Sequence, residues 1–198
     1  MTRAPERPLP SDWLPEPGGW LRRARRVPSP NHDARPPGMP VELLIIHYIS
    51  LPPGRFHGDA VERLFTNRLD VDAHPAFAPL QDLRVSAHFM IRRRGELLQF
   101  VAADARAWHA GASRFGERER CNDFSIGVEL EGDGEHRFTE AQYRRLATLI
   151  ARLRGRYPLR WLAGHSDIAP GRKLDPGPCF DWARVLALPQ ARGLQRPF

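Results

Sequence analysis

The sequence predicts an α/β fold, a single domain in which a central mixed β-sheet is flanked by helices. Short aliphatic runs typical of buried strands alternate along the chain with segments of helical periodicity, a pattern that places helices on the faces of a mixed sheet. The chain has 198 residues, of which 41% are hydrophobic and 27% are charged. This length and composition suit one globular domain with a sizeable core.

The N-terminal segment differs in composition from the rest of the chain. Residues 1–18 are rich in proline and poor in apolar side chains. Such a segment cannot bury enough apolar surface to offset the entropy of ordering it, so we expect an extended, disordered arm. The predicted domain therefore spans residues 19–198 and begins near Trp20.

One strand and one helix are predicted in the first part of the domain. Residues 41–49, VELLIIHYI, are aliphatic and too few for an exposed helix, which favours a buried strand that ends near His47. Residues 59–69 carry apolar side chains at helical spacing. We expect Asp59 to cap this helix.

Two strand signals follow in the middle of the chain. Residues 85–101, VSAHFMIRRRGELLQFV, contain two strand-like runs around an Arg-Gly pair, which predicts a hairpin. Residues 125–132, SIGVELEG, alternate apolar side chains with glycine or glutamate. Because side chains alternate between the two faces of a strand, Glu129 and Glu131 are predicted to share one face.

The last part of the chain predicts two helices and a short strand. Residues 140–154 have an apolar stripe at helical spacing behind a capping box formed by Thr139 and Gln142. Residues 160–165, RWLAGH, predict a short strand that ends in a histidine, and residues 181–188 predict a terminal helix. The amphipathic stripe is interpreted as core packing.

Several features predict a cytoplasmic protein. The apolar runs are much shorter than a bilayer requires, and the first thirty residues carry arginines without the apolar stretch of a signal peptide. The two cysteines, Cys121 and Cys179, form no CxxC pair and are expected to be free thiols.

The formal net charge of +7 leaves two classes of partner open. Phosphate binding by nucleic-acid proteins needs concentrated basic charge, and here the basic runs at 22–26 and 92–94 are short and interleave with no stacking aromatics. A basic surface attracts a small polyanionic substrate equally well. We therefore expect no nucleic-acid partner.

Two histidines at predicted strand ends, His47 and His165, form with Asp175 the minimum protein set for catalytic zinc. Such a site takes three nitrogen or oxygen ligands and keeps its fourth position for water. Spacing alone is a weak signal, because eight histidines are scattered through the chain and most strand histidines are packing residues. The loop APGRKLDPGP strengthens the prediction of a zinc site. Its prolines and glycines restrict the backbone, which must bring the carboxylate of Asp175 back to the two histidines.

Four segments of the chain resemble a known enzyme family. The segments are HYISLPPGRF, RVSAHFMIRRRGELLQFV, RAWHAGASRFGERERCNDFSIGVELEG and GHSDIAPGRKLDPGP, and the family is the bacterial 1,6-anhydro-N-acetylmuramyl-L-alanine amidases, zinc amidases related to peptidoglycan-recognition proteins. The resemblance extends from about Gly19 to about Ala187. It implies one zinc ion per chain and hydrolysis of the amide between the lactyl group of 1,6-anhydro-N-acetylmuramic acid and L-alanine.

A biological setting is implied by the same resemblance. It is cytoplasmic peptidoglycan recycling, with anhydromuropeptides as small-molecule substrates and an indirect influence on β-lactamase induction, by a monomer with no membrane partner. Two alternatives stay open: a general N-acetylmuramoyl-L-alanine amidase that acts on the wall, and a non-catalytic peptidoglycan-binding module. Relatives that only bind lose a zinc ligand, and this chain retains the full set.

The resemblance implies His47, His165 and Asp175 as the metal ligands. The third ligand is cysteine in part of the wider superfamily, which makes Cys179 a rival, but Cys179 lies beyond the family's K-x-D-P-G-P pattern. His88 lies within an apolar run and is expected to be structural.

Two catalytic roles are implied in the same way. Glu129 matches the general base that activates water, and Lys173 matches the cation that stabilises the oxyanion. Alternation does not separate Glu129 from Glu131, and only the resemblance assigns the role to Glu129. Glu131 is expected to be a solvated or supporting carboxylate.

Five further residues are predicted to bind substrate. Arg84 and Arg120 match positions expected to grip the carboxylates of the stem peptide, with surface ion pairs as the alternative. Trp108 and His109 are expected to line the sugar and lactyl side of the groove, with ordinary packing as the alternative. Tyr48 stands where the family usually has asparagine, so the fit of the peptide is expected to differ there.

Overall fold

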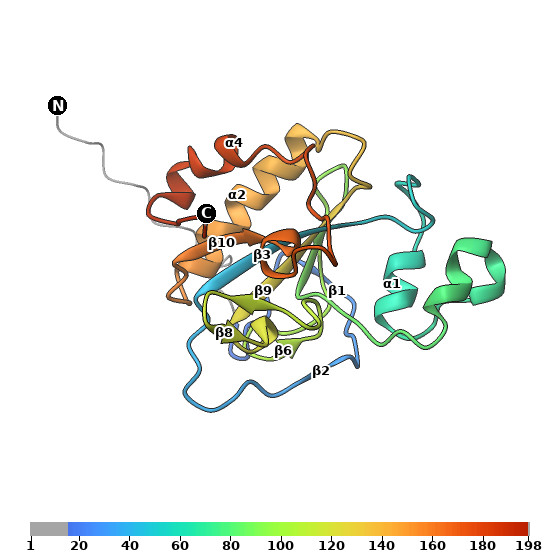
Figure 1. The fold of residues 1–198 in the computed structure, drawn as a ribbon, viewed down its shortest axis with the longest axis horizontal. Coiled ribbons are helices and arrows are strands. Elements are labelled where there is room, and N and C mark those ends of the chain that lie inside the picture. The colour runs from blue at the N-terminus through green and yellow to red at the C-terminus, as the bar shows by residue number, and fades with distance from the viewer. Residues whose placement is uncertain (1–15, 198) are drawn as a thin grey trace.

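A six-stranded mixed sheet runs through the centre of the molecule in the computed structural model, which describes residues 16–197 (Figure 1). From one edge to the other, its strands are β1 (Arg25–Arg26), β5 (Leu97–Gln99), β4 (Phe89–Ile91), β9 (Ser125–Glu131), β3 (Leu43–Ile49) and β10 (Trp161–Gly164). Neighbouring strands are parallel except β4 and β5, which form an antiparallel hairpin. The predicted mixed sheet is therefore confirmed.

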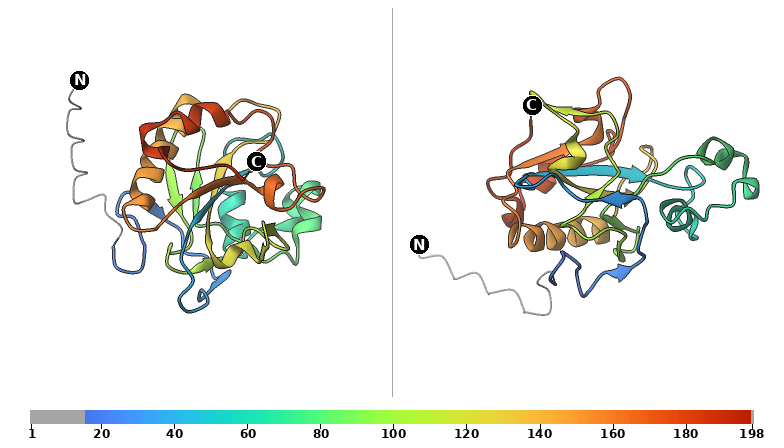
Figure 2. Two further views of the ribbon diagram at one scale, coloured as in Figure 1. Left: turned by 60° about the vertical axis from the view of Figure 1, so that its left-hand side comes forward. Right: turned by 90° about the horizontal axis from the view of Figure 1, so that it is seen from below.

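Helices and small ribbons surround this sheet. The helices are α1 (Ala60–Phe65), α2 (Glu140–Arg154), α3 (His165–Ile168) and α4 (Trp182–Leu186), with 3-10 turns η2 (Val71–Ala73), η3 (Pro75–Leu80), η4 (Cys121–Asp123) and η5 (Pro189–Ala191). Two antiparallel ribbons pair β2 (His32–Asp33) with β6 (Arg106–Ala107) and β7 (Arg114–Phe115) with β8 (Arg118–Glu119). The segment with α1 and η3 projects from the body of the molecule (Figures 1 and 2).

The two faces of the sheet are covered differently. The apolar stripe of α2 packs with Val185 of α4 on the face that presents Leu44 and Ile46 of β3, and the right-hand view of Figure 2 shows α2 along one side of the sheet. The opposite face presents Leu43 and Ile45, which pack against η4 and α3. His47 follows Ile45 by two residues, so it belongs to this second face.

Local sequence signals account for most of these elements. The capping box at α2 forms as predicted, with the Thr139 side chain accepting from the Gln142 backbone and Gln142 accepting from the Thr139 N–H. Gly95, with φ of 82°, supplies the left-handed turn of the β4–β5 hairpin, where other residues would be strained. Both free thiols are confirmed.

Three expectations need correction or fall outside the described residues. The Asp59 side chain does not cap α1, because it pairs with Arg63 instead. Strand β3 continues two residues beyond His47, since its pairing with β9 extends to Ile49 opposite Glu131. Most of the expected arm, residues 1–15, lies outside the described residues, and residues 16–18 belong to a turn.

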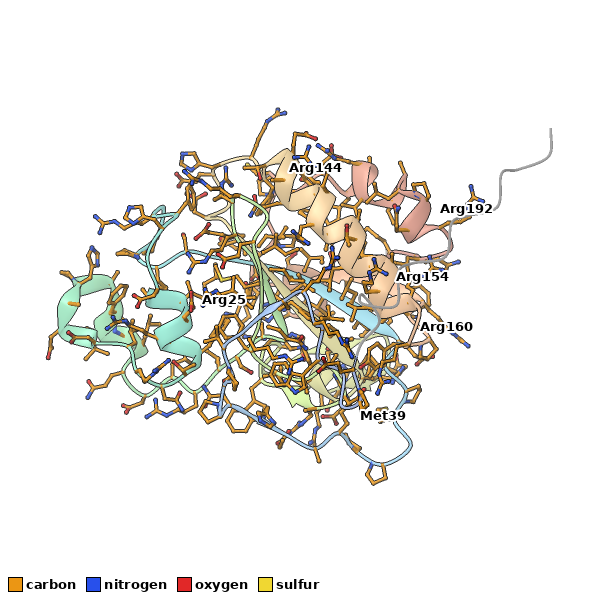
Figure 3. All side chains as sticks on the ribbon, turned by 180° about the vertical axis from the view of Figure 1, so that it is seen from behind. Arg25, Met39, Arg144, Arg154, Arg160 and Arg192 are labelled. Carbon is orange, nitrogen blue, oxygen red and sulfur yellow. The ribbon has the colours of Figure 1, made fainter. Side chains whose placement is uncertain are left out.

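Basic side chains are spread over the surface rather than gathered. Figure 3 shows Arg144 and Arg154 of α2, Arg160 before β10, and Arg192 after η5 at separate points along one side of the molecule. All four are exposed. Within residues 16–197, no helix combines the length and apolar character needed to cross a membrane.

Candidate active site

Three parallel strands bring the predicted site residues to one edge of the sheet. In the pairing of β3 with β9, His47 lies opposite Glu129, and in the pairing of β3 with β10, Ile46 lies opposite Gly164. His165 directly follows Gly164, so it stands level with His47. Because the carboxyl ends of parallel strands meet at one edge, residues far apart in the chain converge there.

A loop after α3 returns Asp175 to the same edge. Its backbone carbonyl accepts from the N–H of Ser166 at 2.9 Å, which ties the loop to the first turn of α3. Gly164 allows this close return, since a Cβ at this position would lie 2.6 Å from Cδ of Pro176. The glycine and proline pattern of the loop thus places its carboxylate beside both histidines.

The ligand atoms of His47, His165 and Asp175 converge on one point. The two Nδ1 atoms are 3.0 Å apart, and Oδ2 of Asp175 lies 2.9 Å from Nδ1 of His47 and 3.2 Å from Nδ1 of His165. Ligands held at 2.0–2.1 Å in a tetrahedron are about 3.3 Å apart. These three residues alone form such a cluster among the described residues, and its dimensions fit zinc.

Proton positions also favour a cation in this cluster. Nε2 of His165 lies 3.1 Å from the backbone oxygen of Ala110, which only accepts, so the imidazole proton belongs on Nε2 and Nδ1 keeps its lone pair. Burial lowers the pKa of His47 to about 4, so its imidazole is neutral at pH 7. The cluster therefore offers a carboxylate and neutral imidazole, the donors that zinc takes.

Glu129 lies beside this cluster, and one oxygen of its buried carboxyl group lacks a hydrogen-bond partner among the described residues. Glu129 is only 7% exposed, and its Oε2 contacts no donor in the part of the chain that the structure describes. Burial raises the pKa of Glu129 well above its ordinary value, and repulsion from Asp175 adds to this effect while Lys173 opposes it. A carboxyl group with a raised pKa next to a candidate metal site suits proton transfer near neutral pH.

Glu131, the next residue on the same face of β9, has partners instead. One of its carboxylate oxygens accepts from the backbone N–H of Arg93 at 2.8 Å, and the other lies 3.5 Å from the guanidinium of Arg92. The structure thus separates two glutamates that alternation places together. Glu131 supports the hairpin between β4 and β5.

A cavity of about 460 Å³ opens over the cluster. Of the residues predicted to bind substrate or to act in catalysis, those lining it are Tyr48, Arg84, Trp108, His109, Glu129 and Lys173. Arg84 is exposed and donates to the backbone oxygen of Gln81, which leaves its guanidinium at the surface of the cavity. The ring of Tyr48 packs against Gly134 and Gly177, where added Cβ atoms would lie 3.1 and 3.6 Å from it.

Arg120 lies apart from these residues. It borders a neighbouring depression of about 460 Å³ that shares only Gly111 with the first cavity, and it pairs with Asp123 at 3.3 Å. Its side chain is 70% exposed. The structure therefore brings Arg84 to the cavity over the cluster and places Arg120 beyond its edge.

Sequence reasoning missed several residues that form the cavity. One group is apolar and comes largely from α1 and η3; it consists of Leu51, Leu64, Phe65, Leu80 and Leu83. Another is polar and consists of Ser86, Asn122 and Arg172. Arg172 directly precedes Lys173 in the loop, a position that offered a signal, whereas the apolar residues stand in no motif that would indicate a role.

Comparisons with known proteins agree on one family. The family model described as N-acetylmuramoyl-L-alanine amidase matches residues 37–178. The 1,6-anhydro-N-acetylmuramyl-L-alanine amidase AmpD of Citrobacter freundii is 56% identical over 172 residues, which are 86% of this chain and 92% of that protein.

Two solved structures extend the comparison. A crystal structure of a selenomethionine derivative of AmpD is similar with a TM-score of 0.85 at 54% identity, over 88% of this chain and 98% of that one. The Escherichia coli amidase AmiD, in complex with the substrate anhydro-N-acetylmuramic acid-L-Ala-D-gamma-Glu-L-Lys, matches with a TM-score of 0.54 at 28% identity, over 88% of this chain and 65% of that one.

Proposed function

This chain belongs to the N-acetylmuramoyl-L-alanine amidase family, and we propose that it hydrolyses the amide between the lactyl group of 1,6-anhydro-N-acetylmuramic acid and L-alanine. His47, His165 and Asp175 hold one zinc ion. The observation that carries the proposal is the convergence of three ligand atoms, 2.9 to 3.2 Å apart, beside Oε2 of Glu129, which has no hydrogen-bond partner among the described residues. A peptidoglycan-binding module has no need of a buried base at this position.

Each residue of the site has a separate task in this reaction. Bound zinc supplies Lewis acidity, which polarises a carbonyl and acidifies water. Glu129 accepts a proton from the attacking water and returns it to the departing amine of L-alanine, because its raised pKa lets it exchange protons near neutral pH. Lys173, at the wall of the same cavity, places a positive charge near the oxygen on which negative charge develops.

The remaining cavity residues bind the substrate. Arg84 offers an exposed guanidinium to a carboxylate of the stem peptide, and Trp108 and Tyr48 supply aromatic walls. Arg120 contacts only a substrate long enough to reach the neighbouring depression. For a short anhydromuropeptide, Arg84→Ala should therefore raise KM more than Arg120→Ala does.

The substrate is a soluble anhydromuropeptide, and the setting is recycling of wall fragments in the cytoplasm by a monomer. The relatives named as anhydro-amidases match along most of this chain, which supports the assignment. AmiD of Escherichia coli, named an N-acetylmuramoyl-L-alanine amidase without the anhydro prefix, is 36% identical over 132 residues. The competing proposal is a general amidase activity without preference for the anhydro sugar.

A comparison of two substrates tests the proposed function. The purified protein, loaded with zinc, is assayed on an anhydromuropeptide and on the reducing-end muramyl peptide with the same stem. We expect kcat/KM to be much higher on the anhydro substrate. Equal values assign the chain to general muramoyl-alanine amidases, and absence of turnover with retained binding of both assigns it to binding modules.

A further inference from the structure

Two consecutive residues, His109 and Ala110, contact both histidines of the cluster from behind. Nε2 of His47 lies 3.0 Å from Nδ1 of His109, and Nε2 of His165 lies 3.1 Å from the backbone oxygen of Ala110. In both histidines Nδ1 faces the cluster, and Nε2 makes the contact with His109 or Ala110. We call His109 and Ala110 the orienting pair.

Imidazole chemistry gives these contacts a direction. A histidine that binds a metal through Nδ1 is neutral and carries its proton on Nε2, so it must find an acceptor there. For His165 the acceptor is a carbonyl oxygen. For His47 the acceptor is Nδ1 of His109, which puts the His109 proton on its own Nε2, 3.3 Å from the hydroxyl of Ser125. Donation therefore runs from His47 to His109 to Ser125.

Several contacts hold the orienting pair in place. The side-chain oxygen of Asn122 accepts from the backbone N–H of His109 at 3.2 Å and of Ala110 at 2.8 Å. Arg172 donates to the backbone oxygen of Ala110 at 2.8 Å. The ring of His109 lies in space left by Gly127, where a Cβ would be 2.5 Å from Cγ of the ring. These restraints come from η4, β9 and the loop before Lys173.

The position of His109 argues against direct recognition of substrate. The residue is 8% exposed, and both ring nitrogens face protein atoms, those of His47 and Ser125. A side chain in this position has no free nitrogen for a sugar or a lactyl group. His109 lines the cavity, as the sequence predicted, but its two ring nitrogens contact protein atoms there.

We propose that His109 is a positioning residue for zinc: its Nδ1 accepts the Nε2 proton of His47, which fixes the tautomer and ring orientation that the metal requires. The proposal rests on the zinc site of the proposed function. Outer hydrogen-bond partners of metal-binding histidines typically change metal affinity by about 10- to 100-fold. His109 is suited to this task because it is buried, anchored through its own backbone and, within residues 16–197, contacted at Nδ1 by His47 alone.

The test measures zinc affinity rather than turnover. Metal-free wild-type protein, His109→Leu and His109→Asn compete for Zn²⁺ with a chromophoric chelator. Leucine keeps the bulk of the ring and removes the acceptor, so we expect affinity to fall about 10- to 100-fold. Asparagine places an oxygen near the position of Nδ1, and we expect it to restore affinity to within about threefold of wild type. Thermal unfolding of the metal-free variants reports any general loss of structure.

A spectroscopic measurement and a second variant complete the test. In a ¹⁵N-¹H imidazole spectrum of the zinc-loaded wild type, the His47 proton is expected on Nε2, and Gly127→Ala, which displaces the His109 ring, should lower zinc affinity as leucine does. Equal zinc affinity in wild type and His109→Leu, equal losses in leucine and asparagine variants, or a His47 proton on Nδ1 would each overturn the proposal. A wild-type protein that binds no zinc rejects the proposed zinc site itself, which is a different result.

Discussion

Two clusters of charged and polar side chains lie near each other along β9, and they are built on opposite principles. In the salt-bridge network, formed by Arg25, Glu62, Arg92 and Glu131, every carboxylate faces a guanidinium: Glu62 lies 2.6 Å from Arg25 and 2.6 Å from Arg92. In the candidate metal cluster of His47, His165 and Asp175, the converging atoms are all potential metal ligands, and Oε2 of the neighbouring Glu129 has no donor among the described residues.

The pKa values of two glutamates express this difference. Burial alone would raise the pKa of Glu62, but hydrogen bonds from Arg25 and Arg92 lower it below its ordinary value. Burial raises the pKa of Glu129, and no guanidinium offsets the effect. Both side chains are largely shielded from solvent, so burial by itself does not explain why their pKa values shift in opposite directions. The presence or absence of a donor does.

Removal of the metal should have the largest effect, because it disables one cluster and leaves the other intact. We expect a chelator to reduce amidase activity to background and added zinc to restore it. Asp175→Ala should lower the zinc content measured by atomic absorption, since the carboxylate supplies one of three protein ligands. Cys179, whose thiol donates to the backbone oxygen of Glu135, serves as the control. Full zinc content in Asp175→Ala, together with loss in Cys179→Ala, would transfer the third ligand to the cysteine.

The next effect separates the two glutamates on the same face of β9. Glu129→Gln keeps the shape of the side chain and removes its basicity, so kcat should fall by about 10² to 10⁴ with zinc content unchanged. Glu131→Gln, a matched substitution two residues away, should reduce kcat by less than about tenfold, because Glu131 contacts the hairpin rather than the cavity. Comparable large losses of kcat in the two variants would contradict the assignment of the base.

A smaller effect concerns the pH dependence of stability in the metal-free protein. Glu129 has a raised pKa in the folded state, so it binds its proton more tightly when folded, and this contribution is present at low pH and lost as pH rises through the folded pKa. Glu62 has a lowered pKa, so its contribution is present above the unfolded value of 4.5 and lost as pH falls through the folded pKa. Chemical denaturation at a series of pH values around the two folded-state pKa values gives the free energy of unfolding for each variant. The change that Glu129→Gln causes in this free energy should vary with pH in the opposite direction to the change that Glu62→Gln causes. Slopes of the same sign would mean that folding shifts the pKa of Glu129 and the pKa of Glu62 in the same direction, which contradicts the contrast between the two clusters.

The smallest effect is expected outside both clusters. Arg114 and Glu119 form an ion pair at 2.8 Å across the β7–β8 ribbon, with side chains 60% and 67% exposed. Glu119→Gln should change the free energy of unfolding by about 0–1 kcal/mol, because water and salt screen exposed pairs. Denaturant titration measures this change, and a loss as large as that of Glu62→Gln would show that solvent access does not control the strength of these pairs.

Local patterns explain how much of the fold was predictable. The capping box of α2 involves Thr139 and Gln142, three residues apart, and the turn of the β4–β5 hairpin depends on Gly95 alone. Such signals are readable because the interacting groups are neighbours in the chain. The ribbons β2–β6 and β7–β8 were missed because strands of two residues carry no measurable periodicity.

By itself, the sequence determined the order of the longer strands and helices, the shared face of Glu129 and Glu131, and, through its family resemblance, the candidate ligands His47, His165 and Asp175. Those properties depend on side-chain periodicity and on residue identity, which any chain displays before it folds. Only the tertiary structure decided which of two glutamates lacks a donor, that His109 faces His47 rather than solvent, and that Arg120 lies beyond the cavity. The reason is physical: His47 meets Asp175 across 128 residues and His109 across 62, and only the folded sheet and its loops bring residues that distant together.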